Sequence, residues 1–182
     1  MHHHVLRRTA NKISSQERWA IIKYGTSARL NAFLSGIDSL TDEEYDYILN
    51  ERTGWRDTIS LARFGLIKND KDVYDFYAKY KKRMYSSEGS IWNNVRDLTW
   101  LNFNPYKTGQ LPSPHSWQTP DFMSRMVEDL RLYRDRAGFY YETIVMHIVS
   151  HFQLTEEAYI RLSVDADLRP EYRNEALKKL IA

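Results

Sequence analysis

The chain has 182 residues, 42% of them hydrophobic and 27% charged, which suits one folded domain or at most two small ones and argues against wholesale disorder. It contains no cysteine, which excludes disulfides and thiolate nucleophiles and fits a reducing, cytoplasmic location. The formal net charge of +2 gives no reason to expect a polyanionic partner, and no apolar run approaches the roughly 20 residues of a membrane span.

Helix signals follow one another along the first half of the chain, where sustained strand alternation is missing. Ser14 or Ser15 predicts a helix start, and Gly25 predicts the end of that helix. Thr41 is followed by three acidic residues and predicts another start, because carboxylates are favourable near a helix N-terminus. The expected helices cover residues 14–24, 27–35, 41 onward, about 55–64 and 70–85.

The second half of the chain begins with a helix expected over about 90–101 and continues with a loop over 104–120, which holds four of the five prolines. Thr119 followed by Pro120 predicts a helix start. Further helices are expected over 120–137, over 139–152, from Thr155 onward and over 170–181. Because the 139–152 segment is rich in β-branched residues, a strand over 143–149 is the alternative.

Two segments of the chain are similar to each other. At a constant offset of 114, residues 40–67 and 154–181 share Leu, Thr, Glu, Tyr, Ala, Leu and Ile at matching positions without a gap. Each segment has a threonine cap, an acidic first turn, an inward tyrosine and a second helix with alanine and leucine packed inward. The pattern predicts either a true helix-hairpin repeat or unrelated hairpins that share their capping residues.

The run LSVDADLRPEYRNEALKKL, within residues 154–181, resembles HEAT-like and variant leucine-rich α-helical repeats, and residues 40–67 resemble them more loosely. The resemblance implies a binding scaffold made of stacked helix pairs, and it transfers no functional residue. We therefore expect an all-α fold of about eight short helices in hairpins, forming an irregular bundle or a short α-solenoid. Residues 1–12 are predicted to be a flexible basic tail and 13–182 a single helical domain, with the 104–120 loop separating two halves.

Few residues are arranged as a catalytic or metal site requires. His147 and His151, four apart on an expected helix, are candidate metal ligands, but the alternative is an ordinary polar helix face that also carries Thr143 and Ser150. A glycine-rich phosphate loop and a Gly-x-Ser-x-Gly elbow are both missing from the sequence. We expect no cofactor, and an enzyme or metal protein built around the two histidines is the weakest of three hypotheses.

Basic residues alternate with aromatic ones over residues 74–85, YDFYAKYKKRMY. Cations neutralise phosphates and rings stack on bases, so this helix is a candidate nucleic-acid interface. The alternative is that the aromatic residues form the buried stripe and that the bases only complement the helix dipole. The candidate nucleic-acid contacts are Lys79, Lys81, Lys82 and Arg83, together with Arg7 and Arg8 of the tail.

The first functional hypothesis is a non-enzymatic protein-interaction module, an accessory or regulatory factor whose partner is another protein. Aromatic residues make up 14% of the chain, which is enough to supply both a core and a contact surface. Trp92, Trp100 and Trp117 are the candidate partner anchors, with burial in the core as the alternative for each. Nucleic-acid binding through the basic-aromatic helix is the second hypothesis.

Overall fold

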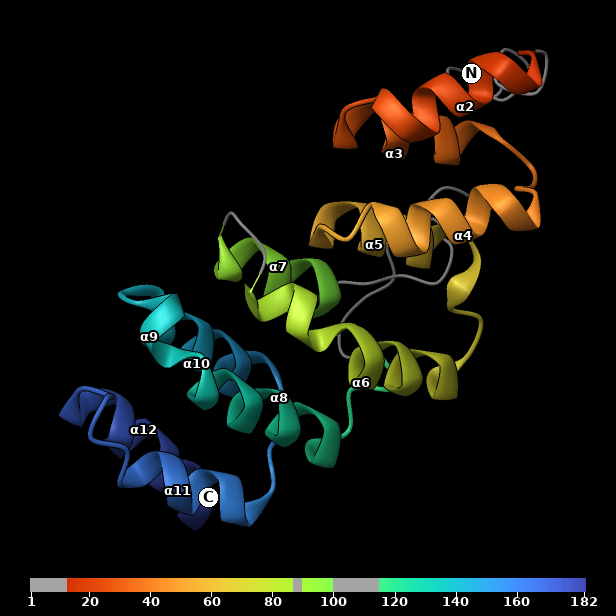
Figure 1. Cartoon of the computed structure of the whole chain (residues 1–182). Coiled ribbons are helices and arrows are strands. Elements are labelled where there is room, and N and C mark those ends of the chain that lie inside the picture. The colour runs from red at the N-terminus through yellow and green to blue at the C-terminus, as the bar shows by residue number, and fades with distance from the viewer. Residues whose placement is uncertain (1–12, 87–89, 100–114) are drawn as a thin grey trace. The chain divides into compact units, whose positions relative to one another are not determined.

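The structure is a computed structural model that describes residues 13–86, 90–99 and 115–182 (Figure 1). Within these ranges it contains eleven α-helices and one π-helical turn and no strand, so the all-α prediction is confirmed. The expected number of about eight helices is too low, and the strand alternative for residues 143–149 is wrong, because this segment lies inside a regular helix. Across the described ranges, no helix combines the length and apolarity that a membrane span needs.

The chain divides into two compact units. Among the described residues, unit 1 contains 13–83 and unit 2 contains 84–86, 90–99 and 115–182. The break at 83/84 lies inside helix α6 (Asp70–Ser86).

Three helices of unit 1 start at a hydroxyl side chain that caps them. The hydroxyls of Ser14, Thr26 and Thr41 each accept a hydrogen bond from a backbone N–H in the first turn. At Thr41 the bond is reciprocal, because the Glu44 carboxylate accepts from the Thr41 N–H at 2.9 Å. The elements are α2 (Ser15–Tyr24), α3 (Ser27–Gly36), α4 (Asp42–Glu51), α5 (Trp55–Leu61), the π-helical turn η1 (Ala62–Leu66) and the first part of α6.

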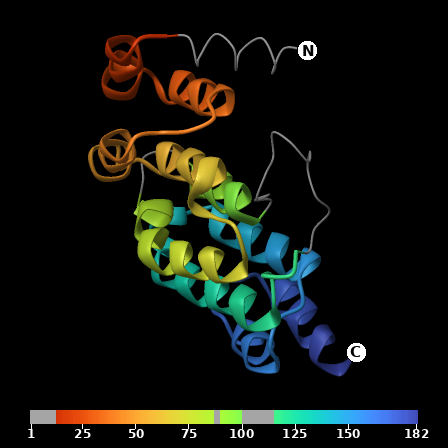
Figure 2. The same cartoon turned by 90° about the vertical axis from the view of Figure 1, so that its right-hand side faces the viewer.

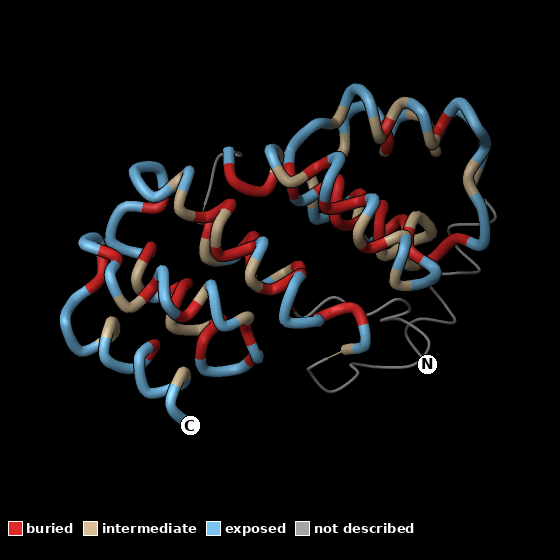
Figure 3. Tube along the Cα trace, turned by 90° about the horizontal axis from the view of Figure 1, so that it is seen from below, coloured by how far each residue is buried: buried red, intermediate tan, exposed pale blue. Residues whose placement is uncertain are grey.

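The core of unit 1 forms where α2 packs against α3 and α4, and where α5 packs against α3 and α4. Its buried residues come from all four helices and from the residue that follows α3. They are Ile22, Leu30, Phe33, Leu34, Ile37, Ile48 and Leu61. In the burial-coloured trace, buried positions alternate with exposed ones along the helices (Figure 3).

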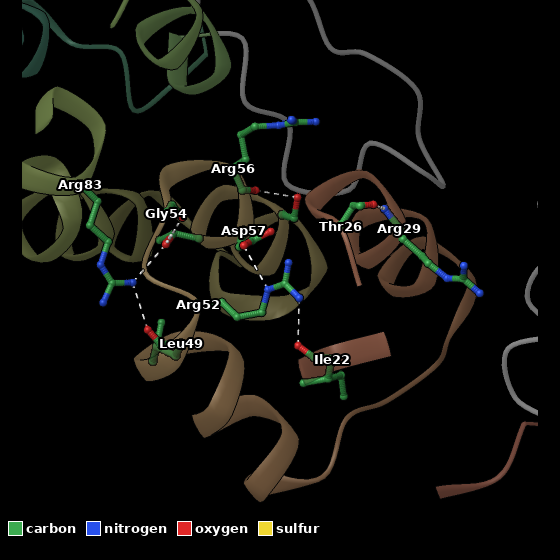
Figure 4. A network of polar contacts seen from close by, with 11 residues as sticks. Ile22, Thr26, Arg29, Leu49, Arg52, Gly54, Arg56, Asp57 and Arg83 are labelled. Carbon is green, nitrogen blue, oxygen red and sulfur yellow. Dashed lines mark hydrogen bonds and ion pairs between the residues drawn. The ribbon is translucent and has the colours of Figure 1, made fainter. Parts of the chain in front are cut away.

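Two arginines of unit 1 cap the ends of earlier helices. Arg52 donates to the Ile22 carbonyl at 2.9 Å and pairs with Asp57 at 3.1 Å. Arg83 donates to the Leu49 carbonyl and to the Thr58 hydroxyl, both at 3.0 Å. Figure 4 shows both guanidinium groups directed at these carbonyls, which lie in the last turns of α2 and α4. The unpaired carbonyls of a helix end are thus satisfied by side chains from distant parts of the sequence.

Unit 2 contains α7 (Ile91–Thr99), α8 (Pro120–Leu132), α9 (Arg134–Ala137), α10 (Tyr140–His151), α11 (Glu156–Ser163) and α12 (Pro170–Ile181). Helix α10 packs against α7 and α8 through its buried aliphatic side chains, and α11 and α12 lie side by side in two perpendicular views (Figures 1 and 2). Thr119 with Pro120, and Thr155, start their helices as expected.

The two similar segments are both helix pairs, α4–α5 and α11–α12. At the offset of 114, the first helices begin at equivalent residues, Asp42 and Glu156, each after a capping threonine. Ala62 and Ala176 are equivalent and both are buried. Equivalent residues also differ in burial, and the clearest difference lies at one end: Ile67 is buried whereas its equivalent, Ile181, is 81% exposed.

Candidate functional site

The turn between α8 and α10 has an unusual backbone. Tyr133 directly follows helix α8, and its N–H donates to the Leu130 carbonyl. Gly138 directly follows the four-residue helix α9, and its N–H donates to the Arg134 carbonyl. Gly138 has φ 55° and ψ −128°, the single positive φ among the described residues. L-residues avoid this conformation, so glycine is required here by the backbone and not by crowding, since a Cβ would meet nothing within 4 Å.

Three apolar side chains around this turn face solvent. Phe139, directly after Gly138, is 99% exposed, and Leu132 and Tyr140 are 76% and 54% exposed. Single exposed apolar residues are ordinary, but here three of them occur within nine residues of sequence, 132–140. We call the exposed set Leu132, Phe139 and Tyr140 the aromatic turn.

A polar pocket of about 460 Å³ adjoins the aromatic turn. Its walls come from α9, from the start of α10 and from the loop between α11 and α12. The lining residues are Arg134, Asp135, Gly138, Phe139, Tyr141, Glu142, Asp167 and Arg169.

Two ion pairs hold the α11–α12 loop against α9 and α10. The Arg134 Nε lies 2.7 Å from the Asp167 Oδ2, and the Arg169 Nε lies 2.9 Å from the Glu142 Oε2. The backbone N–H of Arg169 also donates to Glu142, at 2.7 Å. Each pair is partly exposed and contributes little stability by itself, but together they fix the loop that forms one wall of the pocket.

The deepest group of the site is the Tyr141 hydroxyl, which donates to the buried Asp165 carboxylate at 2.6 Å. The same carboxylate accepts the Asp167 N–H at 2.9 Å, and the Arg131 Nε lies 4.0 Å from it. Burial, and then the hydrogen bond to Asp165, raise the pKa of Tyr141 far above its ordinary value. Tyr141 is therefore a neutral donor at physiological pH, and it anchors the α11–α12 loop to α10.

The site combines an exposed apolar side chain with a charged pocket. The exposed Phe139 stands beside a pocket in which two ion pairs, Arg134–Asp167 and Arg169–Glu142, are already formed, and binding surfaces commonly combine an apolar anchor with a polar rim in this way. In the part of the chain that the structure describes, no group of three or more His, Asp or Glu side chains is placed to hold a metal ion.

The three candidate tryptophan anchors have different positions. Trp117 is fully buried, stacked on His115 and edge-on to Phe122, so its position does not suit contact with a partner. The physical reason is that the end of the 104–120 segment packs into the core of unit 2, where an indole contributes a large buried area. Trp92 is partly exposed and lies edge-on to His147 at 5.0 Å, while Trp100 lies outside the described residues.

The basic-aromatic helix α6 is divided between core and surface. Tyr77 and Tyr80 are buried, so their rings cannot stack on nucleic-acid bases. Arg83 is committed to the Leu49 carbonyl and the Thr58 hydroxyl, which corrects its assignment as a phosphate contact. The ammonium groups of the neighbouring lysines lie near ring faces or in solvent: Lys79 near Tyr80, Lys81 near Tyr77 and Lys82 exposed. Arg7 and Arg8 lie outside the described residues.

His147 and His151 lie together on α10, with ring centroids 4.5 Å apart. The His151 Nδ1 is 2.8 Å from the His147 carbonyl oxygen, so this nitrogen is engaged within the helix. Burial, followed by the nearby His151 and Arg96, lowers the pKa of His147 to about 4. His147 is therefore neutral at physiological pH and packs as an aromatic group against Trp92.

The helix periodicity of residues 139–152 places Phe139 inside an apolar helix and therefore does not predict the aromatic turn. The available signal was the run Gly138 to Tyr141, GFYY, in which aromatic residues directly follow a glycine that ends a helix. A residue on the turn itself, before α10 begins, does not follow the helix periodicity that buries Tyr141, Ile144 and Val145.

Comparison with known proteins finds no matching family model, no matching curated protein and no matching solved structure. The resemblance of residues 154–181 to HEAT-like repeats therefore stays a prediction.

Proposed function

We propose that the chain is a non-enzymatic α-helical protein-interaction module, an accessory or regulatory factor that binds its partner through the aromatic turn. The observation that carries this proposal is Phe139, which is 99% exposed on a turn that only glycine permits. An exposed phenylalanine next to a polar pocket resembles the anchors that dominate the energetics of protein–protein contacts.

The expected contribution of Phe139 follows from its area. Burying a phenylalanine side chain is worth about 1.5–3 kcal/mol, and each 1.4 kcal/mol changes an affinity tenfold. Replacing Phe139 by alanine should therefore weaken the partner complex by roughly 10- to 100-fold. Because the side chain makes little contact with its own chain, the substitution should leave stability nearly unchanged.

Quantitative affinity capture from the source cell tests the proposal. The wild-type chain, Phe139→Ala and the control Ile160→Ala are compared; Ile160 is an exposed apolar residue on α11 of the same unit. We expect at least one protein to be captured by wild type and by the control but to be lost with Phe139→Ala. Equal recovery of every captured protein by all three chains would refute the role of the aromatic turn.

Nucleic-acid binding is the second candidate, and one observation favours it: Lys79 and Lys82 are exposed one turn apart on α6. Because the neighbouring tyrosines are buried, such binding would rest on charge contacts to phosphates and would be insensitive to sequence.

A further inference from the structure

The polar pocket beside the aromatic turn holds one carboxylate that the chain itself leaves unpaired. Two arginines and three carboxylates line the pocket, so its walls carry one more negative charge than positive. Two of the carboxylates, Asp167 and Glu142, form ion pairs with Arg134 and Arg169. Within the ranges that the structure describes, the third carboxylate, Asp135, is exposed and forms neither a hydrogen bond nor an ion pair.

The two arginines of the pocket each have a second contact besides their ion pair. Arg134 donates to the Arg131 carbonyl at 2.8 Å. The guanidinium of Arg169 lies over the Tyr172 ring, 5.6 Å from the ring centroid. Both guanidinium groups are thus held by other groups of the chain, and neither is placed on Asp135.

The unpaired carboxylate shares the pocket with an exposed aromatic ring, that of Phe139. The face of an aromatic ring attracts a cation. A guanidinium can stack on such a ring and also present paired N–H donors that match a carboxylate, whereas an ammonium lacks the planar surface. Arg136 follows Asp135 in the sequence but is not among the described residues that line the pocket. Asp135 and Phe139 together are therefore complementary to an arginine side chain.

We propose that the partner protein inserts an arginine side chain into this pocket, with the guanidinium paired to Asp135 and stacked on Phe139. The inference rests on the proposed function, because it names the chemical group that the aromatic turn recognises. An acidic side chain of a partner would face the same unpaired carboxylate and would be repelled, so the pocket also selects against acidic partners.

Nuclear magnetic resonance titration of the full chain with blocked amino acids tests the recognised group. The probes are N-acetyl-arginine N-methylamide, its neutral isostere N-acetyl-citrulline N-methylamide, and N-acetyl-lysine N-methylamide. We expect the arginine probe to shift the backbone amide signals of residues 134–142 and to bind more tightly than the lysine probe, and the citrulline probe to bind most weakly. The same spectra report whether each variant is folded.

A matched pair of substitutions assigns the charge that is recognised. Asp135→Asn should weaken binding of the arginine probe about threefold, as the loss of a partly exposed ion pair does. Asp121→Asn should leave it unchanged, since Asp121 is likewise an exposed aspartate in the first turn of a helix but does not line the pocket. Equal binding of the arginine and citrulline probes would overturn the proposal, as would an unchanged affinity in Asp135→Asn. The absence of any shift with the arginine probe up to about 20 mM would overturn it too.

Affinity capture from the source cell separates a failure of this inference from a failure of the proposed function. A protein that is lost with Phe139→Ala should also be reduced with Asp135→Asn and retained with Asp121→Asn. If it is lost with Phe139→Ala but fully retained with Asp135→Asn, the arginine contact is wrong and the proposed function stands. If both variants recover it as wild type does, the arginine contact and the proposed function are both wrong.

Discussion

Replacing Gly138 by alanine should destabilise unit 2, whereas the same replacement at Gly65 should stabilise unit 1. Gly138 has φ 55°, a conformation that alanine avoids, and Gly65 does not have a positive φ. At both positions an added Cβ meets nothing within 4 Å, so crowding does not contribute to either effect. The two substitutions therefore isolate backbone conformation as the cause.

The magnitudes follow from two opposing terms. Holding a non-glycine residue in a sparsely populated backbone region costs about 1–3 kcal/mol. Reducing the entropy of the unfolded chain returns about 0.4–1 kcal/mol. Gly138→Ala should thus lower the free energy of unfolding of its unit by about 1–2 kcal/mol, and Gly65→Ala, in the helical segment η1, should raise it by about 0.4–1 kcal/mol.

Hydrogen exchange followed by mass spectrometry is the appropriate assay, because a chain with two compact units need not unfold in one step. Peptides covering 134–151 report on unit 2 and peptides covering 55–66 report on unit 1. Two outcomes would refute this reasoning: both alanine variants shift stability in the same direction, or Gly138→Ala leaves stability unchanged. Either result would mean that the turn before Phe139 does not depend on the positive φ of Gly138.

Three further predictions concern acidity and charge. Burial alone would raise the pKa of Glu44, but hydrogen bonds from Arg18 and from the Thr41 backbone outweigh burial, so the pKa is lowered. The stabilisation of α4 by the ionised Glu44 should therefore be complete above the pKa of the unfolded state and should be lost as pH falls below about 4.3. Glu44→Gln should cost about 3 kcal/mol at pH 7 in urea unfolding, and the exposed neighbour Glu43→Gln less than about 0.5. His147 has a lowered pKa of about 4, so the unfolded state binds a proton first as pH falls. The protection of α10 against hydrogen exchange, after correction for the pH dependence of intrinsic exchange, should decrease as pH falls from about 6.5 to about 4, and His147→Asn should flatten that decrease. If the chain binds nucleic acid, replacing Lys79 and Lys82 by glutamine should reduce the slope of log affinity against log salt by up to about two; an unchanged slope removes α6 as the interface.

Capping residues were the most predictable part of the fold, because a capping bond is local. Ser14, Thr41, Thr119 and Thr155 each bond a backbone N–H within three residues, and each was identified from the sequence as a possible helix start. Trp117 was harder to place, since a tryptophan in a proline-rich segment has the same local sequence whether it is buried or exposed. The aromatic turn was missed because its exposure depends on where α9 ends, which one φ angle at Gly138 decides.

Arg83 shows why long-range polar contacts escape sequence patterns. Its partner carbonyl, Leu49, lies 34 residues earlier, and in the sequence the arginine belongs to a basic run. Yet the contact of Arg83 belongs to a pattern that recurs three times, in which a later side chain donates to a carbonyl near the end of an earlier helix. The three donors are Arg52, Arg83 and Asn94, and their acceptors are the carbonyls of Ile22, Leu49 and Met84 in that order. Each of these carbonyls belongs to the third residue from the end of its helix, α2, α4 and α6.

Arg83 therefore belongs to the scaffold, and a matched pair of substitutions tests that assignment. Arg83→Met removes two hydrogen bonds from a charged donor, each worth about 1.5–3 kcal/mol, and it should accelerate hydrogen exchange in the last turn of α4 by at least tenfold. Lys82→Met, at the exposed neighbouring position, should change this exchange little. The opposite ranking would mean that the Leu49 carbonyl does not depend on Arg83. The expected ranking would show that Arg83 stabilises the end of α4. On α6, the exposed lysines Lys79 and Lys82 would then be the candidates for contact with a partner.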